Sequence, residues 1–186
     1  MKQEIENDLI DWYHTLDQNR GLRASLRRCK NVSEIFCAEG FQSLLGRTKS
    51  VWLRSASEEK SASNVQQSNF VALAIIAALF SHVKKNDNSA SFAAQLGPNG
   101  KEKEVMSELR FKRLLLANTA DELFRQLRRA ISLREGSVNL VSLADGVFAW
   151  CRENNSFYRT VRPTDSIKVK WALDYFQAQD SKDFTK

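Results

Sequence analysis

The chain has 186 residues, of which 42% are hydrophobic and 10% aromatic, and its formal net charge at pH 7 is +6. These totals suit one or two small globular domains with a real core. No stretch reaches the roughly 20 consecutive apolar residues that a membrane helix needs, so we expect no membrane segment. The three cysteines (Cys29, Cys37 and Cys151) are widely spaced, and the acidic N-terminus differs from a secretory signal. We therefore expect a reduced, cytoplasmic protein.

Positive charge is concentrated in two windows of the sequence. Residues 19–30 hold five basic groups and no acid, and residues 110–134 hold seven basic groups and two acids. Together the two windows carry a net +10, against +6 for the whole chain, which leaves −4 for the remainder. Two basic patches on a mildly acidic body are typical of proteins that bind phosphate backbones.

The pattern of the first half predicts helices, because glycines and prolines are few and apolar residues recur at helical spacing. A helix over residues 3–16 has one apolar stripe, and Asn19 is a candidate N-cap for a second helix. At 3.6 residues per turn, this second helix has a core stripe bordered by a basic stripe, whereas Arg28 points elsewhere. The basic stripe consists of Arg20, Arg23, Arg27 and Lys30.

The rest of the first half combines a polar segment with an apolar helix. Ser33 is a candidate cap for a short helix. Residues 54–69 are polar and rich in serine, which predicts a mobile loop. The apolar helix over residues 69–84 is expected at the centre of a first bundle. A short helix near residues 90–96 then ends at Gly-Pro-Asn-Gly, residues 97–100, which is the preferred domain boundary.

The second half is also predicted to be helical, so the fold class is all-α. A helix over residues 101–117 precedes a capping box formed by Thr119 and Glu122. The next helix, over residues 120–134, is divided into a core face and a basic face. Its core face holds Leu123, Leu127, Ala130 and Ile131, and its basic face holds Arg125, Arg128 and Arg129. Helices are expected over residues 139–152 and after Pro163, with residues 179–186 frayed.

The sequence offers little for catalysis. Its histidines are His14 and His82, and structural or exposed roles suit both. No cysteine–histidine cluster has the spacing of a metal site, and no glycine-rich phosphate loop or nucleophile motif occurs. We therefore predict no enzymatic activity, no metal and no cofactor. Two arginine-rich faces with few acidic partners favour a polyanion, because guanidinium groups match phosphate oxygens bidentately.

Several motifs carry a family resemblance. Residues 19–28 read NRGLRASLRR, and residues 108–150 contain an R-F-x-R-L-L element, then L-R-R, then L-A-x-x-x-x-x-W. These motifs, in this order, resemble the CasB family, the small subunit of the type I-E Cascade, an RNA-guided CRISPR surveillance complex. The apolar helix over residues 70–80 also corresponds to the family pattern.

The resemblance implies two helical bundles joined by a short linker, which would divide the chain into residues 1–97 and 101–186. It implies a non-catalytic subunit in antiviral defence that contacts the guide RNA–target DNA hybrid and helps to hold the displaced strand. The implied partners are the guide RNA, the target DNA, the other Cascade subunits and a second copy of this chain placed head-to-tail.

The resemblance also suggests which residues bind nucleic acid. The L-R-R elements supply Arg27, Arg28, Arg128 and Arg129, and the R-F-x-R element supplies Arg110 and Arg113. Lys168 and Lys170 begin the last helix, where family members are often basic. With the helical faces described above, the predicted nucleic-acid-binding residues are Arg20, Arg23, Arg27, Arg28, Lys30, Arg110, Arg113, Arg125, Arg128, Arg129, Lys168 and Lys170.

Two other interpretations stay open. A free-standing, sequence-specific helical DNA-binding regulator would need base-reading amide side chains among its arginines, and residues 120–134 offer only Gln126. An adaptor protein could instead use its arginines to bind an acidic protein partner. Co-purification with a guide RNA and large backbone-type subunits would distinguish the Cascade subunit from both.

Overall fold

The computed structural model describes residues 3–56, 62–98, 104–155 and 162–180. Over these residues the fold is all-α apart from two strands of two residues each, which confirms the predicted class. The elements of the first half are α1 (Gln3–Gln18), α2 (Arg20–Arg28), α3 (Val32–Phe36), α4 (Glu39–Ala56), α5 (Ala62–His82), β1 (Lys85–Asn86) and the 3-10 helix η1 (Ala94–Leu96). The second half contains α6 (Glu108–Leu115), α7 (Ala120–Leu133), β2 (Ser137–Val138), α8 (Leu140–Glu153), η2 (Pro163–Asp165) and α9 (Ile167–Asp180).

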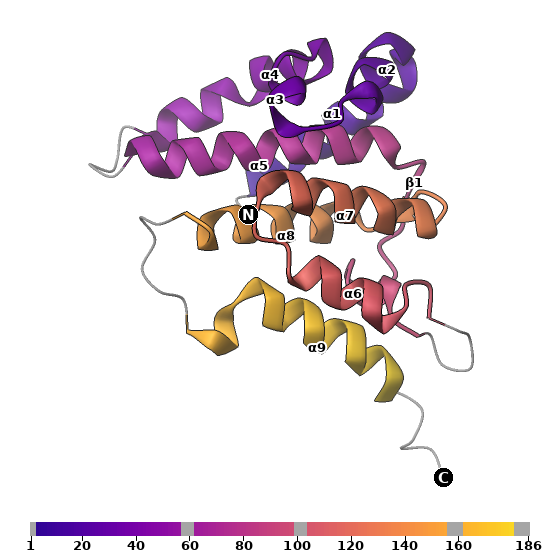
Figure 1. Cartoon of the computed structure of the whole chain (residues 1–186). Coiled ribbons are helices and arrows are strands. Elements are labelled where there is room, and N and C mark those ends of the chain that lie inside the picture. The colour runs from indigo at the N-terminus through magenta and orange to yellow at the C-terminus, as the bar shows by residue number, and fades with distance from the viewer. Residues whose placement is uncertain (1–2, 57–61, 99–103, 156–161, 181–186) are drawn as a thin grey trace.

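The helix α5 forms the centre of the molecule (Figure 1). Residues 72–80 are apolar on every side of the helix, and each of them is 0% exposed. A helix that is hydrophobic all round has to be surrounded by other elements. Accordingly α2, α3 and α4 pack on α5 from the first half of the chain, and α7 and α8 pack on it from the second. The predicted central position of the apolar helix is confirmed, although α5 spans residues 62–82 rather than 69–84.

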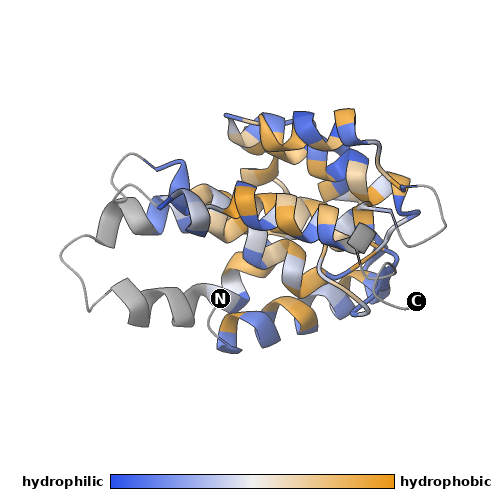
Figure 2. Cartoon of the chain, turned by 90° about the horizontal axis from the view of Figure 1, so that it is seen from below, coloured by the Kyte–Doolittle hydropathy of each residue, from blue (hydrophilic) through white to orange (hydrophobic). Residues whose placement is uncertain are grey.

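The outer helices are amphipathic, and Figure 2 shows hydrophobic and hydrophilic residues side by side along most of them. In α1 the predicted stripe is buried, with Leu9, Trp12 and Leu16 at 0–1% exposure. The buried residues of both halves form one continuous cluster. The division of the chain into domains over residues 1–97 and 101–186 stays a prediction.

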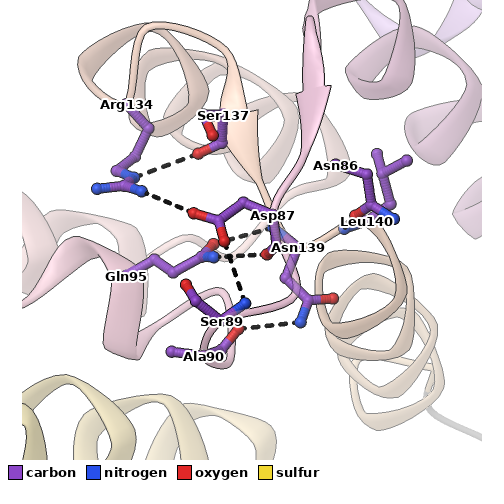
Figure 3. Close-up of polar contacts among 9 residues, drawn as sticks. All are labelled: Asn86, Asp87, Ser89, Ala90, Gln95, Arg134, Ser137, Asn139 and Leu140. Carbon is purple, nitrogen blue, oxygen red and sulfur yellow. Dashed lines mark hydrogen bonds and ion pairs between the residues drawn. The ribbon is translucent and has the colours of Figure 1, made fainter.

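A short parallel bridge and a polar network join the segment after α5 to the connection between α7 and α8 (Figure 3). Asp87 forms an ion pair with Arg134 at 3.2 Å. The side chain of Gln95 donates from Nε2 to the Asp87 carbonyl at 2.7 Å and accepts from the Asn139 amide at 2.9 Å. Because Gln95 is buried, these bonds satisfy polar atoms whose burial would otherwise cost stability.

The structure corrects the predicted loop over residues 54–69. Helix α4 continues to Ala56 and α5 begins at Ala62, so residues 54–56 and 62–69 are helical, while residues 57–61 lie outside the described residues. Serine, glutamine and alanine are compatible with a helix, and most of the stability of a helix in a protein comes from its tertiary context, which the polar composition of one segment does not reveal.

The predicted helix over residues 101–117 is shorter than expected, because α6 begins only at Glu108. Residues 101–103 lie outside the described residues, and residues 104–107 are not helical. Met106 is held instead by tertiary contacts: its amide donates to the Leu96 carbonyl at 3.0 Å, and its carbonyl accepts from the Tyr175 hydroxyl at 2.6 Å. These contacts compete successfully with continuation of the helix.

Three smaller boundaries also differ from the prediction. Asn31, rather than Ser33, caps α3, and its side chain accepts from the Glu34 amide at 2.9 Å. Only residues 94–96 of the short helix expected near 90–96 are helical, as a 3-10 turn. Helix α9 continues to Asp180, and residues 181–186 lie outside the described part of the chain.

Gly40 and Gly46 lie on the same helix, α4, and make a matched pair for testing the close approach of α2. A Cβ at Gly40 would lie 2.6 Å from Leu26 Cδ1 and 2.8 Å from the Leu22 carbonyl oxygen, whereas a Cβ at Gly46 would meet no described atom within 4 Å. We expect Gly40→Ala to lower the free energy of unfolding by about 1–3 kcal/mol, because α2 has to move. Gly46→Ala should leave it unchanged or raise it by up to about 1 kcal/mol. Urea unfolding measures both, and equal stabilities would contradict this contact.

Candidate nucleic-acid interface

Helix α7 is the central element of the candidate interface. Thr119 caps it and accepts from the Glu122 amide at 3.2 Å, which confirms the predicted cap. Asp121 and Glu122 lie in the first turn, where negative charge stabilises a helix through its dipole. The predicted core residues of the helix are all buried, and Phe124 is buried with them. The opposite face therefore presents its basic side chains outward, with Arg125 and Arg129 exposed and Arg128 half-buried.

A first pocket lies between α2, the C-terminal end of α5 and α7, with a volume of about 520 Å³. We call it the α2–α7 pocket. Four cations line it, against one carboxylate, that of Glu135. The cations are Arg27, Lys84, Arg128 and Arg129, and His82 also lines the pocket.

A second pocket of about 380 Å³, the α6–α7 pocket, lies between α6 and α7. It is lined by Arg110 and Arg113 from α6 and by Gln126 and Arg129 from α7. Arg129 and Ser132 line both pockets, so the two adjoin along α7. We call the combined surface the basic groove; its cations are Arg27, Lys84, Arg110, Arg113, Arg128 and Arg129. The fold thus brings Arg27 of the first basic window together with arginines of the second on one surface.

Two arginines of the α2–α7 pocket are fixed by backbone carbonyls at helix ends. Arg27 donates from Nε to the carbonyl of Ser81, in the last turn of α5, at 2.7 Å. Arg128 donates to the carbonyl of Cys29, just after α2, at 3.4 Å, and its guanidinium lies 5.4 Å from the centre of the Phe124 ring. Carbonyls at helix C-termini lack partners within the helix, so they are natural acceptors for arginine. These bonds hold the guanidinium groups without neutralising their charge.

His82, at the C-terminal end of α5, is affected by this positive charge. Burial of its ring, together with the charges of Arg128 and Arg27, lowers its pKa from 6.5 to about 4. Its Nε2 atom is buried and has no hydrogen-bond partner among the described residues. His82 is therefore neutral at pH 7.

The remaining predicted binding residues do not line the basic groove. Arg23 is held in the N-terminal region, where it pairs with Asp17 at 2.9 Å and lies over the ring of Tyr13. Lys168 donates to the Ala117 carbonyl at 3.3 Å, and Lys170 lines a different pocket that also contains carboxylates. The others are exposed away from both pockets: Arg20, Arg28, Lys30 and Arg125. Their role in nucleic-acid binding stays a prediction.

The helical geometry expected for the second helix holds only in part. Helix α2 ends at Arg28, so Lys30 lies beyond the helix and does not continue its basic stripe. Conversely, sequence reasoning missed Lys84 and the position of His82 in the groove. Lys84 lies two residues beyond the end of α5, but nothing in the local pattern indicates that this end of α5 faces α2 and α7.

Other kinds of site are not indicated by the described residues. No group of three or more His, Cys, Asp and Glu side chains among them could hold a metal ion. All three cysteines are free thiols, and Cys29 and Cys151 are buried. Within the same residues, none of the helices is both long enough and apolar enough to span a membrane.

The fold and the groove describe an all-helical protein with a basic surface organised along one helix. The model of the CRISPR-associated protein Cse2 family matches residues 22–176, so the chain belongs to this family. The crystal structure of CasB from Thermus thermophilus is similar, with a TM-score of 0.59 and 21% sequence identity over 93% of this chain and 97% of that chain. Among curated protein sequences no relative matches. The resemblance to the CasB family inferred from the motifs is confirmed.

Arg128 and Arg129 are neighbours on α7 with different surroundings, which separates a structural from a surface role. We expect Arg128→Ala to lower the free energy of unfolding by about 1–2 kcal/mol, because the bond to Cys29 and the contact with Phe124 are lost. Arg129→Ala should change it by less than about 0.5 kcal/mol. Thermal unfolding followed by circular dichroism compares the two, and an Arg128→Ala variant as stable as the parent would show that this contact contributes nothing.

The lowered pKa of His82 predicts a loss of stability in mild acid. The folded protein keeps His82 neutral down to about pH 4, whereas the unfolded chain protonates it below about 6.5, so unfolding becomes more favourable as the pH falls through this window. Because the ring is only half-buried, we expect a loss of about 1–2 kcal/mol. The His82→Gln variant should lose correspondingly less between these pH values, and His14→Gln serves as the control. Identical pH profiles for parent and His82→Gln would contradict the assignment.

Proposed function

We propose that this protein is the non-catalytic small subunit of a type I-E Cascade complex and binds the phosphate backbones of the guide RNA–target DNA hybrid and of the displaced strand. The observation that carries the proposal is the basic groove, in which six cations from both halves of the chain line two adjoining pockets along α7. Membership of the Cse2 family supports the assignment to a CRISPR complex. The partners are the guide RNA, the target DNA, the other Cascade subunits and a second, head-to-tail copy of this chain.

The chemistry of the groove suits recognition of a backbone rather than of a sequence. In an RNA-guided complex, base pairing with the guide reads the sequence, so a protein subunit needs only to recognise charge and shape. A basic groove that binds the displaced strand opposes its re-annealing. Because exchange of duplex for hybrid is nearly balanced, contacts worth about 1–3 kcal/mol would substantially raise the fraction of open target.

The free-standing regulator is less well supported by the same groove. Gln126 is the only amide side chain among the described residues that line the two pockets. Sequence-specific readout in the major groove relies on several side chains aimed at base edges, arginine and amide groups together. The groove cations are instead distributed over α2, α6, α7 and the segment that follows α5, without one recognition helix that carries them all.

A variant pair on α6 tests the proposal. Arg110 and Arg113 line the groove, whereas Lys112 lies on the same helix, does not line it and pairs with Glu108. We expect the double variant Arg110→Ala/Arg113→Ala to bind single-stranded DNA and hybrid more weakly. The slope of log affinity against log salt should fall by about 1–2, because up to two phosphate contacts are lost. Lys112→Ala should behave as the parent.

The decisive measurement is target-DNA opening by the complex reassembled with guide RNA. If the folded double variant opens target DNA as well as the parent at low salt, the groove is only a solvated surface. Preference for one duplex sequence over scrambled controls at physiological salt would favour the regulator. Failure of the chain to co-purify with a guide RNA and backbone-type subunits, together with capture of an acidic protein, would favour the adaptor.

A further inference from the structure

We propose that the α2–α7 pocket binds one phosphodiester group of the nucleic-acid backbone and that His82 takes up a proton when this group is bound. The inference rests on the proposed function, because it concerns one position within the same basic groove. It adds a specific phosphate site and a proton linkage to that function.

The geometry of the pocket supports a bound anion. Four cations surround a volume of about 520 Å³, against the single carboxylate of Glu135, so the lining carries a net charge of +3. Among the described residues none of these four cations has an ion-pair partner. Arg27 from α2 and Arg128 from α7 are each held by a backbone carbonyl. Oriented guanidinium groups without counterions are suited to phosphate oxygens.

His82 also lines this pocket, and the protonation of its imidazole ring depends on the charges around it. The charged groups facing it are Arg27 from α2, Lys84 after α5, Arg128 and Arg129 from α7, and Glu135 after α7. No charged side chain from α1, α3 or α8 lines the pocket in the described part of the chain. The buried Nε2 atom of His82 has no partner there, so a protonated ring would have neither an acceptor nor a compensating charge in the free protein.

A bound phosphodiester removes both obstacles to protonation. Burial of the ring is the largest cause of the low pKa of His82 in the free protein, and the charges of Arg128 and Arg27 lower it further. The negative charge of the phosphodiester offsets these two charges, and its oxygens bring hydrogen-bond acceptors into the pocket. The pKa of His82 is therefore higher in the complex than in the free protein. By linkage, a group that gains a proton on binding makes binding tighter as the pH falls. Affinity for nucleic acid should therefore increase in mild acid through this one residue.

The chain has only two histidines, which makes the test direct. The probe is a short oligodeoxythymidylate, with oligouridylate as a second arm, because the phosphodiester is common to DNA and RNA. Proton NMR follows the ring signals of His82 and His14 in the full-length protein between about pH 4 and pH 8. We expect saturating oligonucleotide to move the His82 titration to higher pH with both probes, and to move the exposed His14 less.

Binding measurements provide the second readout. We expect the affinity of the parent to rise about fivefold between about pH 7.5 and pH 5.5 beyond the rise shown by His82→Gln. The His14→Gln control should keep the full rise, and His82→Gln should bind like the parent at the higher pH. If the parent binds oligonucleotide but the His82 titration does not move and the two pH profiles coincide, this inference is wrong while the proposed function stands. If no nucleic acid binds at any pH, alone or in the assembled complex, the proposed function itself fails.

Discussion

The burial of α5 is the constraint on which the rest of the structure depends. A helix with nine consecutive residues at 0% exposure cannot lie at a surface, so elements from both halves of the chain surround it. Its C-terminal end then lies at the α2–α7 pocket, and the carbonyl of Ser81 at that end needs a donor. Arg27 provides it. The position of the basic groove is thus a consequence of how the central helix is covered and terminated.

The arginines of this protein differ in the groups that hold them. This difference distinguishes arginines whose charge is neutralised within the fold from arginines whose charge can attract a ligand. Arg23 and Arg134 pair with Asp17 and Asp87, so their charge is compensated locally. Arg27 and Arg128 are held by neutral carbonyls, which restrict the guanidinium groups but leave their charge available. A cation that is already oriented loses less conformational freedom when it binds a phosphate. This is why the groove, rather than the total number of basic residues, supports the proposed function.

One groove can both bind a phosphate backbone and control the protonation of His82, because the same positive electrostatic potential acts on both. The positive potential that attracts phosphate also disfavours the charged form of His82. The titration of His82 therefore reports whether the α2–α7 pocket is occupied by an anion. The α6–α7 pocket contains no histidine, so the linkage is confined to one end of the groove.

Much of this protein can be predicted from its sequence, because the predictable features depend on neighbours along the chain. Helical spacing identified the apolar stripe of α1, the cap at Thr119 and the two faces of α7, and the arginine motifs identified the family. The end of α4 and the starts of α5 and α6 were predicted wrongly, because a polar composition does not exclude a helix and because the contacts of Met106 hold the segment before α6. Only the tertiary structure brought Arg27, Lys84 and Arg128 into one pocket. Charge clustering between residues distant in sequence depends on which helices cover α5, and local periodicity does not encode that choice.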